Sequence, residues 1–309
     1  MLHGWIILDK PVGLGSTSAV SAIKRMLREA GEPKTKVGHG GTLDPLASGV
    51  LPIALGEATK LAGRMLDATK AYDFTIRFGE ETDTLDREGE VVATSDVRPT
   101  LDQIAAILPT FTGPIEQVPP VFSALKIDGK PAYARARAGE TLAMAPRKVT
   151  IHDLCVSASL REIEALAQGR GDAEEGHSVT LSATVSKSTY IRSLARDIAR
   201  ALGTVGHVTM LRRTRAGPFG LASAVTLDFL GQSAKARRLM EMVLPLEAAL
   251  DDIPALPVSP GQAQLLRHGQ RLAGFPAQPG LALATDAGRP VALVEALADG
   301  LRVVRGFNL

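Results

Sequence analysis

Residues 37–52 read VGHGGTLDPLASGVLP, and the rest of the chain is organised around this stretch. Three of residues 38–41 are glycine, which allows backbone conformations and close approaches that other residues do not reach. Pro45 biases Asp44 toward an extended conformation. The pattern predicts a fixed loop that presents one carboxylate, followed by a short apolar strand at residues 50–55. An Asp before a Pro is also common in turns without any chemical role, and the spacing alone leaves both interpretations open.

Length and composition bound the class of protein. A chain of 309 residues is long enough for about two domains. It has no apolar run near the roughly 20 residues that a membrane-spanning helix needs. The N-terminus has no charged region before an apolar stretch, so we expect no secretory signal and a cytoplasmic protein. The one cysteine, Cys155, excludes an internal disulfide and a multi-cysteine metal site. It lies in the alternating run 149–156, which favours buried packing over a nucleophile.

The charge is unevenly distributed, although the net charge is only +2. Residues 187–215 hold seven Lys or Arg against one acid, and residues 10–36 hold six against two. Local basic patches on a nearly neutral chain are typical of proteins that bind phosphates. Scattered solvated charge is the alternative for either patch.

In the first half of the chain, apolar spacing and turn residues predict alternating strands and helices. Ser16, Thr17 and Ser18 are suited to cap the first of these helices, and Thr100 with Gln103 forms a capping box for the last. The acids in residues 82–86 are too few for a convincing metal site, which favours a solvated turn. The expected elements are a strand at 5–8, a helix from 16 to 30, a helix from 56 to 65, a strand at 72–78 and a helix from 100 to 108.

The second half continues this alternation. Pro119 and Pro120 predict an extended edge entering a strand. The helix that ends at Leu202 has an apolar stripe, and three arginines repeat beside it at four-residue spacing. Residues 161–177 are Gly-rich and acidic, which predicts a surface loop. The other expected elements are a helix at 132–138 and strands at 147–156, 178–185 and 207–213.

The composition changes past residue 250. Residues 251–257 are typical of a linker, and a small β-rich unit follows with one helix at 261–267. Its expected strands are 281–285, 291–295 and 301–305. We therefore expect two domains, residues 1–250 and residues 251–309.

Five segments together resemble the TruB family of tRNA pseudouridine synthases, in the right order over nearly the whole chain. The most specific is GHGGTLDP at 38–45. The others are KAYDF at 70–74, the Pro-Pro stretch 117–126, SKSTYIR at 186–192 and HVTMLRR at 207–213. The C-terminal unit, with LLRHGQRL at 265–272, resembles the PUA-type RNA-binding module of bacterial members.

The resemblance implies an α+β fold, in which the catalytic domain has a mixed, largely antiparallel central sheet flanked by helices and loops. A small C-terminal β-rich PUA-like domain follows it. The implied reaction is isomerisation of uridine-55 in the TΨC arm of tRNA, without cofactor or metal. We expect a monomer with tRNA as its partner, no membrane association and no obligatory protein partner.

The family's site residues transfer to matching positions in this chain. Asp44 matches the essential aspartate, which starts the reaction either by attacking the base or by assisting a glycal route at the ribose. Tyr72, which its alternation alone would assign to the core, matches the tyrosine that stacks on the base. The remaining matches are Tyr190 as a second substrate contact, Arg192 as the partner of the aspartate, Leu211 and Lys187 in the pocket, and His39 in the space vacated by the flipped nucleotide.

The resemblance also makes physical sense of the surrounding residues. A base stacked in RNA must be extruded, at a cost of a few kcal/mol, and stacking on Tyr72 recovers roughly 1–3 kcal/mol. A guanidinium beside a carboxylate favours its charged form. Four further arginines are expected to contact the RNA backbone: Arg196, Arg200, Arg212 and Arg213.

Two other functions compete with this one. An RNA-binding protein that acts mainly as a tRNA folding chaperone would have the same basic surface, but the intact set Asp44, Tyr72 and Arg192 argues against lost catalysis. A guide-RNA-dependent relative that modifies ribosomal RNA is disfavoured by the bacterial-type C-terminal unit and by the absence of a basic tail.

Overall fold

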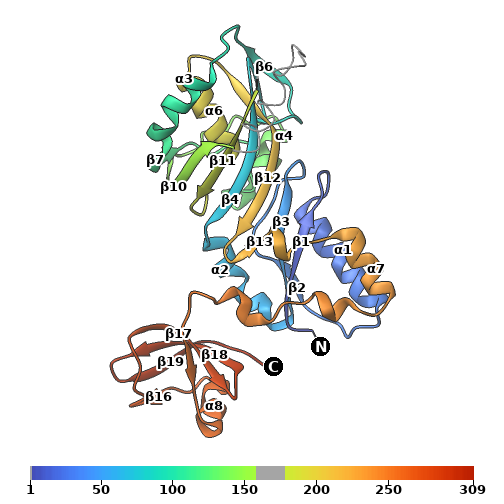
Figure 1. The fold of residues 1–309 in the computed structure, drawn as a ribbon, viewed down its shortest axis with the longest axis vertical. Coiled ribbons are helices and arrows are strands. Elements are labelled where there is room, and N and C mark those ends of the chain that lie inside the picture. The colour runs from blue at the N-terminus through green and yellow to red at the C-terminus, as the bar shows by residue number, and fades with distance from the viewer. Residues whose placement is uncertain (1, 158–177) are drawn as a thin grey trace. The chain divides into compact units, whose positions relative to one another are not determined.

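The computed structural model describes residues 2–157 and 178–309, so the predicted surface loop 161–177 lies outside the described residues (Figure 1). The chain divides into two compact units. Unit 1 holds Met1–Leu43, Val50–Leu66 and Gly217–Leu309, and unit 2 holds Asp44–Gly49 and Asp67–Ala216. The domain boundary expected after residue 250 stays a prediction. Within the described ranges, no helix is both long enough and apolar enough to cross a bilayer.

Unit 1 holds the strands β14-β1-β3 of a ten-stranded sheet, with β2 antiparallel along β3. β1 is buried along most of its length, and its buried residues include Trp5, Ile6, Ile7 and Leu8. The elements of this part are β1 Gly4–Lys10, α1 Ser16–Glu29, β2 Val37–His39, β3 Ser48–Leu55, η1 Gly56–Leu61, α2 Ala62–Asp67, β13 Phe219–Gly220, η4 Leu221–Ser223, β14 Val225–Thr226, α7 Leu227–Lys235, η5 Leu239–Met242 and η6 Leu246–Ala249.

The predicted first strand and first helix are confirmed, but the predicted hydroxyl cap is wrong. Gly15 is the N-cap of α1 and no side chain caps it. The Ser16 hydroxyl instead donates to the Leu43 carbonyl and accepts from the Leu43 N–H. The helix expected at 56–65 begins as a 3-10 helix, η1, and only its last turn is the α-helix α2.

The C-terminal part of unit 1 is a five-stranded sheet in the order β15-β17-β18-β19-β16. Its three predicted strands and its helix are confirmed, and a capping box between Ser259 and Gln262 begins that helix. The linker expected at 251–257 ends in a strand, because Ala255–Pro257 pairs with β17. The elements are β15 Ala255–Pro257, α8 Pro260–Arg267, β16 Leu272–Ala273, β17 Gly280–Asp286, β18 Arg289–Leu297 and β19 Gly300–Gly306.

Unit 2 is built on the antiparallel strands β12-β4-β11-β10-β7, and the first residues of β3 run parallel to β12. The predicted mixed, largely antiparallel sheet is therefore confirmed. Phe74, Ile76 and Phe78 of β4 form a buried core with Leu194 and Ile198 of α6. The elements are β4 Lys70–Phe78, β5 Glu80–Thr82, β6 Val91–Thr94, α3 Leu101–Ile107, η2 Leu108–Phe111, β7 Gly113–Gln117, β8 Lys126–Ile127, β9 Lys130–Pro131, α4 Ala132–Arg137, β10 Arg147–Val156, β11 Ser178–Val185, α6 Ile191–Ala201 and β12 Gly206–Ala216.

The structure of unit 2 corrects the predicted strand after Pro120 and the predicted burial of Cys155. No strand follows Pro120 directly, because the carbonyls of Val118 and Phe122 accept hydrogen bonds from side chains of α6 rather than from a neighbouring strand. Cys155 is exposed rather than buried. A register shift between Ile151 and Asp153 reverses the alternation of β10, so that Leu154 faces the core.

Candidate active site

The loop that carries Asp44 is fixed from both ends. Before it, the reciprocal hydrogen bonds of Ser16 hold both backbone groups of Leu43, at 2.8 and 2.9 Å. After it, Gly49 has a φ of +101°, and a Cβ there would lie 2.2 Å from the Arg213 carbonyl oxygen. Packing therefore requires a glycine at residue 49, and the loop holds Asp44 in one place.

The Arg192 guanidinium binds Asp44. Oδ2 of Asp44 lies 2.8 Å from Nη2 of Arg192. The Asp44 side chain is 40% exposed, whereas the Arg192 side chain is 6% exposed. A buried cation therefore holds a carboxylate that still reaches solvent, which is the arrangement expected of a group that must meet a substrate.

A second carboxylate binds the same guanidinium from the other side. Oδ2 of Asp86 lies 3.3 Å from Nη1 of Arg192, and the Asp86 side chain is 10% exposed. Its Oδ1 accepts hydrogen bonds from the Thr84 hydroxyl at 2.7 Å and the Glu88 N–H at 3.0 Å. Asp86 is thus held by its own turn and is the buried counter-charge of Arg192.

Two backbone carbonyls complete the environment of the guanidinium. Nη1 of Arg192 donates to the Thr84 carbonyl at 2.8 Å, and Nη2 donates to the Phe122 carbonyl at 2.9 Å. Arg192 lies in the first turn of α6, where the helix dipole disfavours a cation. The two carboxylates and two carbonyls offset this cost. The position of Arg192 is therefore explained by its contacts in the site and not by the stability of the helix.

Tyr190 is the N-cap residue of α6, and its N–H donates to Oε1 of the buried Gln117 at 2.8 Å. Burial raises the pKa of its phenol; the Asp44 charge acts in the same direction, and the charges of Arg147 and Arg192 oppose it. The phenol is therefore protonated at neutral pH and can donate or accept a hydrogen bond.

A small pocket opens at these groups. Asp44, Asp86 and Arg192 line it together with Leu211 and its neighbours on β12. Its volume of about 20 Å³ is enough for a single water molecule. The pocket brings a partly exposed carboxylate, a buried counter-ion pair and an apolar wall to one place.

Comparison with known proteins identifies the family of this chain. Residues 24–191 match the TruB family pseudouridylate synthase N-terminal domain, and residues 192–251 match the tRNA pseudouridylate synthase B C-terminal domain. The chain belongs to the TruB family. The predicted activity is confirmed at this level: the protein is an isomerase that converts uridine to pseudouridine in tRNA.

Related proteins are similar to this chain over nearly its full length. The chain is 58% identical to tRNA pseudouridine synthase B of Novosphingobium aromaticivorans, over 100% of this chain and 98% of the relative. It is 56% identical to the protein of the same name from Zymomonas mobilis, over 99% and 96%. A solved structure of an H/ACA RNP bound to a substrate RNA has the same fold, with a TM-score of 0.71 and 24% identity over 99% of this chain and 86% of that one.

Not every residue that matches the TruB motifs lines this pocket. Tyr72 is partly buried and packs against the core of unit 2 beside Phe74. His39 lies in unit 1, at the end of β2, opposite Ile53. Lys187 is bound to Asp67 at 2.9 Å, and both side chains are more than half exposed. The pocket therefore assembles Asp44, Arg192 and Leu211 from the predicted set, and Tyr190 lies within reach of their charges.

The four arginines predicted to contact RNA differ in accessibility. Arg200 is 57% exposed and paired with Glu81, and Arg212 is partly exposed, with Nη1 3.4 Å from the Ser48 hydroxyl. Arg196 is 12% exposed and is bound to Asp197 and to the Val118 carbonyl. Arg213 is 1% exposed, so its side chain does not reach the surface. Arg200 and Arg212 are therefore the more accessible of the four.

Asp86 is the site residue that sequence reasoning missed. Two acids among threonines predicted a solvated turn, yet Asp86 is buried while Asp83 stays exposed. The one available signal was Leu85, an apolar residue inside a polar turn. It is buried with a φ of +62°, and the adjacent Asp86 is buried as well.

Proposed function

We propose that this protein isomerises uridine-55 in the TΨC arm of tRNA and that Asp44 starts the reaction. The observation that carries the proposal is the shared guanidinium, since Arg192 binds the partly exposed Asp44 on one side and the buried Asp86 on the other. A carboxylate fixed in this way is paired, oriented and open to a substrate.

The proposed reaction conserves the atoms of the nucleotide apart from one exchanged proton. The bond between C1′ and N1 breaks, the uracil rotates while it is bound, and a bond forms between C1′ and C5. C5 then loses its proton to solvent, and N1 gains one. The reaction needs no oxidant, reductant or transferred group. Positioned side chains are therefore sufficient to catalyse it.

The other matched residues take roles around the extruded nucleotide in this proposal. Tyr72 stacks on the base, Tyr190 contacts the substrate with its protonated phenol, and Leu211 forms the apolar wall. His39 occupies the space that the base leaves in the RNA, and Lys187 takes the role of the family's pocket lysine. Base extrusion costs a few kcal/mol, which stacking and the burial of the base offset.

The size of the pocket limits how the base can reach Asp44. A volume of about 20 Å³ does not hold a uracil ring. The base must therefore approach Asp44 from its exposed side or displace Met210 and Leu211 of β12, both of which line the pocket. Met210 is 39% exposed and can move without disturbing the core.

The deciding experiment measures tritium release from unmodified tRNA labelled at C5 of uridine. Purified protein alone should release tritium, and tRNA with cytidine at position 55 should release none from that site. Asp44→Asn should abolish release while still binding tRNA. Matching turnover in Asp44→Asn and the unaltered protein would reject the role of Asp44.

Asp73→Asn is a suitable control. Asp73 is another carboxylate of the same unit, partly buried on β4, and its Oδ1 accepts a hydrogen bond from the Ser182 hydroxyl at 2.7 Å. It does not line the pocket. This variant should release tritium at close to the rate of the unaltered protein.

A further inference from the structure

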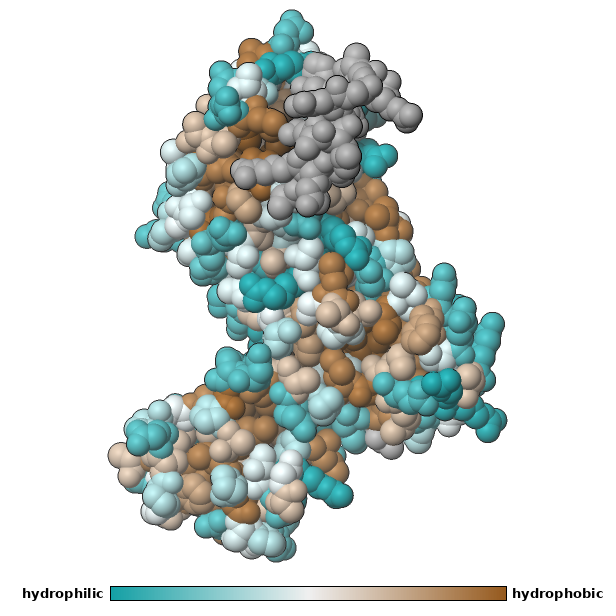
Figure 2. All heavy atoms as spheres, viewed as in Figure 1, coloured by the Kyte–Doolittle hydropathy of each residue, from teal (hydrophilic) through white to brown (hydrophobic). Residues whose placement is uncertain are grey.

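A groove in unit 1 carries a second concentration of positive charge. One wall is a single face of α1, formed by Lys24, Leu27 and Arg28, and the other is the segment 32–37. The groove holds about 850 Å³. Figure 2 shows hydrophilic side chains gathered over the α1 and α7 face of this unit. We call this feature the α1 groove.

Four exposed cations line the α1 groove: Lys24, Arg28, Lys34 and Lys36. Glu32 is the single acid among the lining residues. Within the described ranges, none of these four cations forms an ion pair, whereas the neighbouring Arg25 is paired with Glu29 at 3.8 Å. An uncompensated excess of positive charge along a groove attracts an anionic ligand.

Backbone hydrogen bonds hold the walls in place. The Glu32 N–H donates to the Leu27 carbonyl at 2.9 Å, which folds the segment back against α1. The Gly56 N–H donates to the Lys36 carbonyl at 2.8 Å, and Val37 begins β2. Leu27 and Val37 are buried beneath. The cations therefore stand on a fixed frame, which reduces the ordering cost of binding.

We propose that the α1 groove binds backbone phosphates of the tRNA substrate, in addition to the contacts at the catalytic pocket. The ligand class follows from the chemistry: four cations spread along a groove match a row of phosphates better than a single anion, and phosphate contacts position RNA without reading its sequence. The inference rests on the proposed function for the identity of the RNA.

The test compares salt-dependent tRNA binding by variants that remove two charges each. Lys34→Ala with Lys36→Ala alters one wall, and Lys24→Ala with Arg28→Ala alters the other. Lys235→Ala with Arg238→Ala is the matched control, because it removes two exposed charges of the same unit outside the groove. All three variants change the net charge by the same amount.

Each groove variant should bind unmodified tRNA several-fold more weakly than the control. The slope of log affinity against log salt should become shallower by about 1.4–1.8, which corresponds to two lost phosphate contacts. Equal slopes in groove and control variants would overturn the proposal. Weaker binding to anionic lipid vesicles with unchanged tRNA binding would also overturn it, in favour of a membrane ligand.

The two proposals fail separately. If the unaltered protein does not release tritium from tRNA, the proposed function fails whatever the binding slopes are. If it does release tritium and the groove variants bind like the control, only the α1 groove proposal fails. Because the two variants alter different walls, a folding defect in one still leaves the other as a test.

Discussion

Asp44 and Asp86 bind opposite arms of one guanidinium, that of Arg192, at 2.8 and 3.3 Å. The two carboxylates are 42 residues apart in sequence and differ in exposure, at 40% and 10%. This asymmetry separates their roles. Asp44 is open to a substrate, whereas Asp86 is largely buried and holds Arg192.

Arg192→Lys should separate charge from geometry. Lysine keeps the positive charge but has no planar fork, so it does not serve two carboxylates and two carbonyls together. We expect kcat to fall by about 10²-fold because Asp44 loses its fixed orientation. Arg192→Ala leaves Asp86 buried without its cation and should lower the free energy of unfolding by about 3–5 kcal/mol.

Chemical denaturation and the tritium assay together measure these effects. Full activity in Arg192→Lys would show that orientation by the fork is not needed.

Asp86→Asn should lower activity without contacting the substrate. The amide can still accept from Thr84 and Glu88, but it removes the negative charge that faces Nη1 of Arg192. We expect kcat to fall by about 10²-fold with KM for tRNA nearly unchanged, because a positioning residue acts after binding. Asp83→Asn is the control in the same turn, since Asp83 is exposed. A change in KM alone would contradict a positioning role.

Ser16→Ala tests how the Asp44 loop is held. The substitution removes both hydrogen bonds to Leu43, which is buried, and leaves its N–H and carbonyl without those partners. Two buried polar groups left unsatisfied should cost about 2–4 kcal/mol of unfolding free energy. Ser21→Ala on the same helix is the control, because its hydroxyl bonds only the exposed Thr17 carbonyl. Equal stability of the two variants would refute the proposed anchor.

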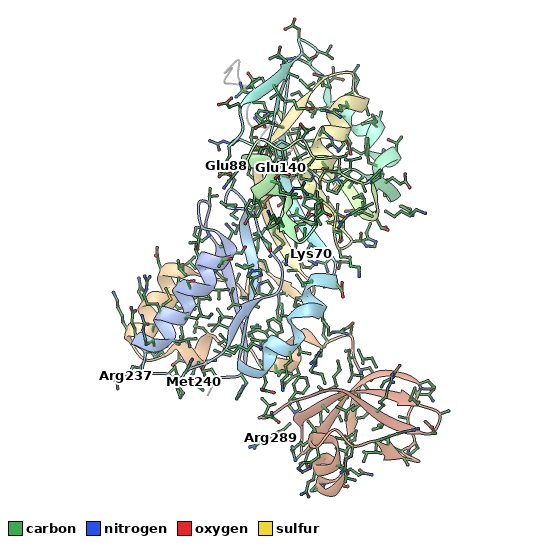
Figure 3. All side chains as sticks on the ribbon, turned by 180° about the vertical axis from the view of Figure 1, so that it is seen from behind. Lys70, Glu88, Glu140, Arg237, Met240 and Arg289 are labelled. Carbon is green, nitrogen blue, oxygen red and sulfur yellow. The ribbon has the colours of Figure 1, made fainter. Side chains whose placement is uncertain are left out.

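The lowered pKa of Lys70 predicts that the free energy of unfolding depends on pH. Lys70 lies at the start of β4 (Figure 3), and burial lowers the pKa of its ammonium from 10.5 to about 8, with the Arg213 charge acting in the same direction. Between pH 8 and 10.5 the unfolded chain binds the proton and the folded chain does not, so stability from this group rises with pH. Below pH 8 the folded protein carries the full cost of a buried charge.

Lys70→Met should therefore gain stability relative to the unaltered protein at pH 7, and the gain should shrink as the pH rises from 8 to 10.5. Unfolding by denaturant at several pH values measures the difference. Lys148→Met, on the exposed side of β10, controls for the loss of a lysine. A gain that does not vary with pH would contradict the depressed pKa.

Local sequence signals determined most of the secondary structure. The capping box of Thr100 and Gln103 forms as expected, because both of its hydrogen bonds lie within four residues. The apolar alternation of β4 and the stripe of α6 also predicted which faces are buried. The motif around Asp44 pointed to the carboxylate, and its resemblance to TruB sequences pointed to Arg192, Tyr190 and Leu211.

Only the tertiary structure decided the features that depend on distant partners. Cys155 became exposed because a register shift in β10 reversed its alternation. Arg192, Arg196 and Arg200 are evenly spaced in sequence, yet their exposure rises from 6% through 12% to 57% along the helix. Asp86 entered the site because α6 brings a cation to its turn. Periodicity fixes which residues share a face, whereas burial and ion pairing depend on what the fold places opposite that face.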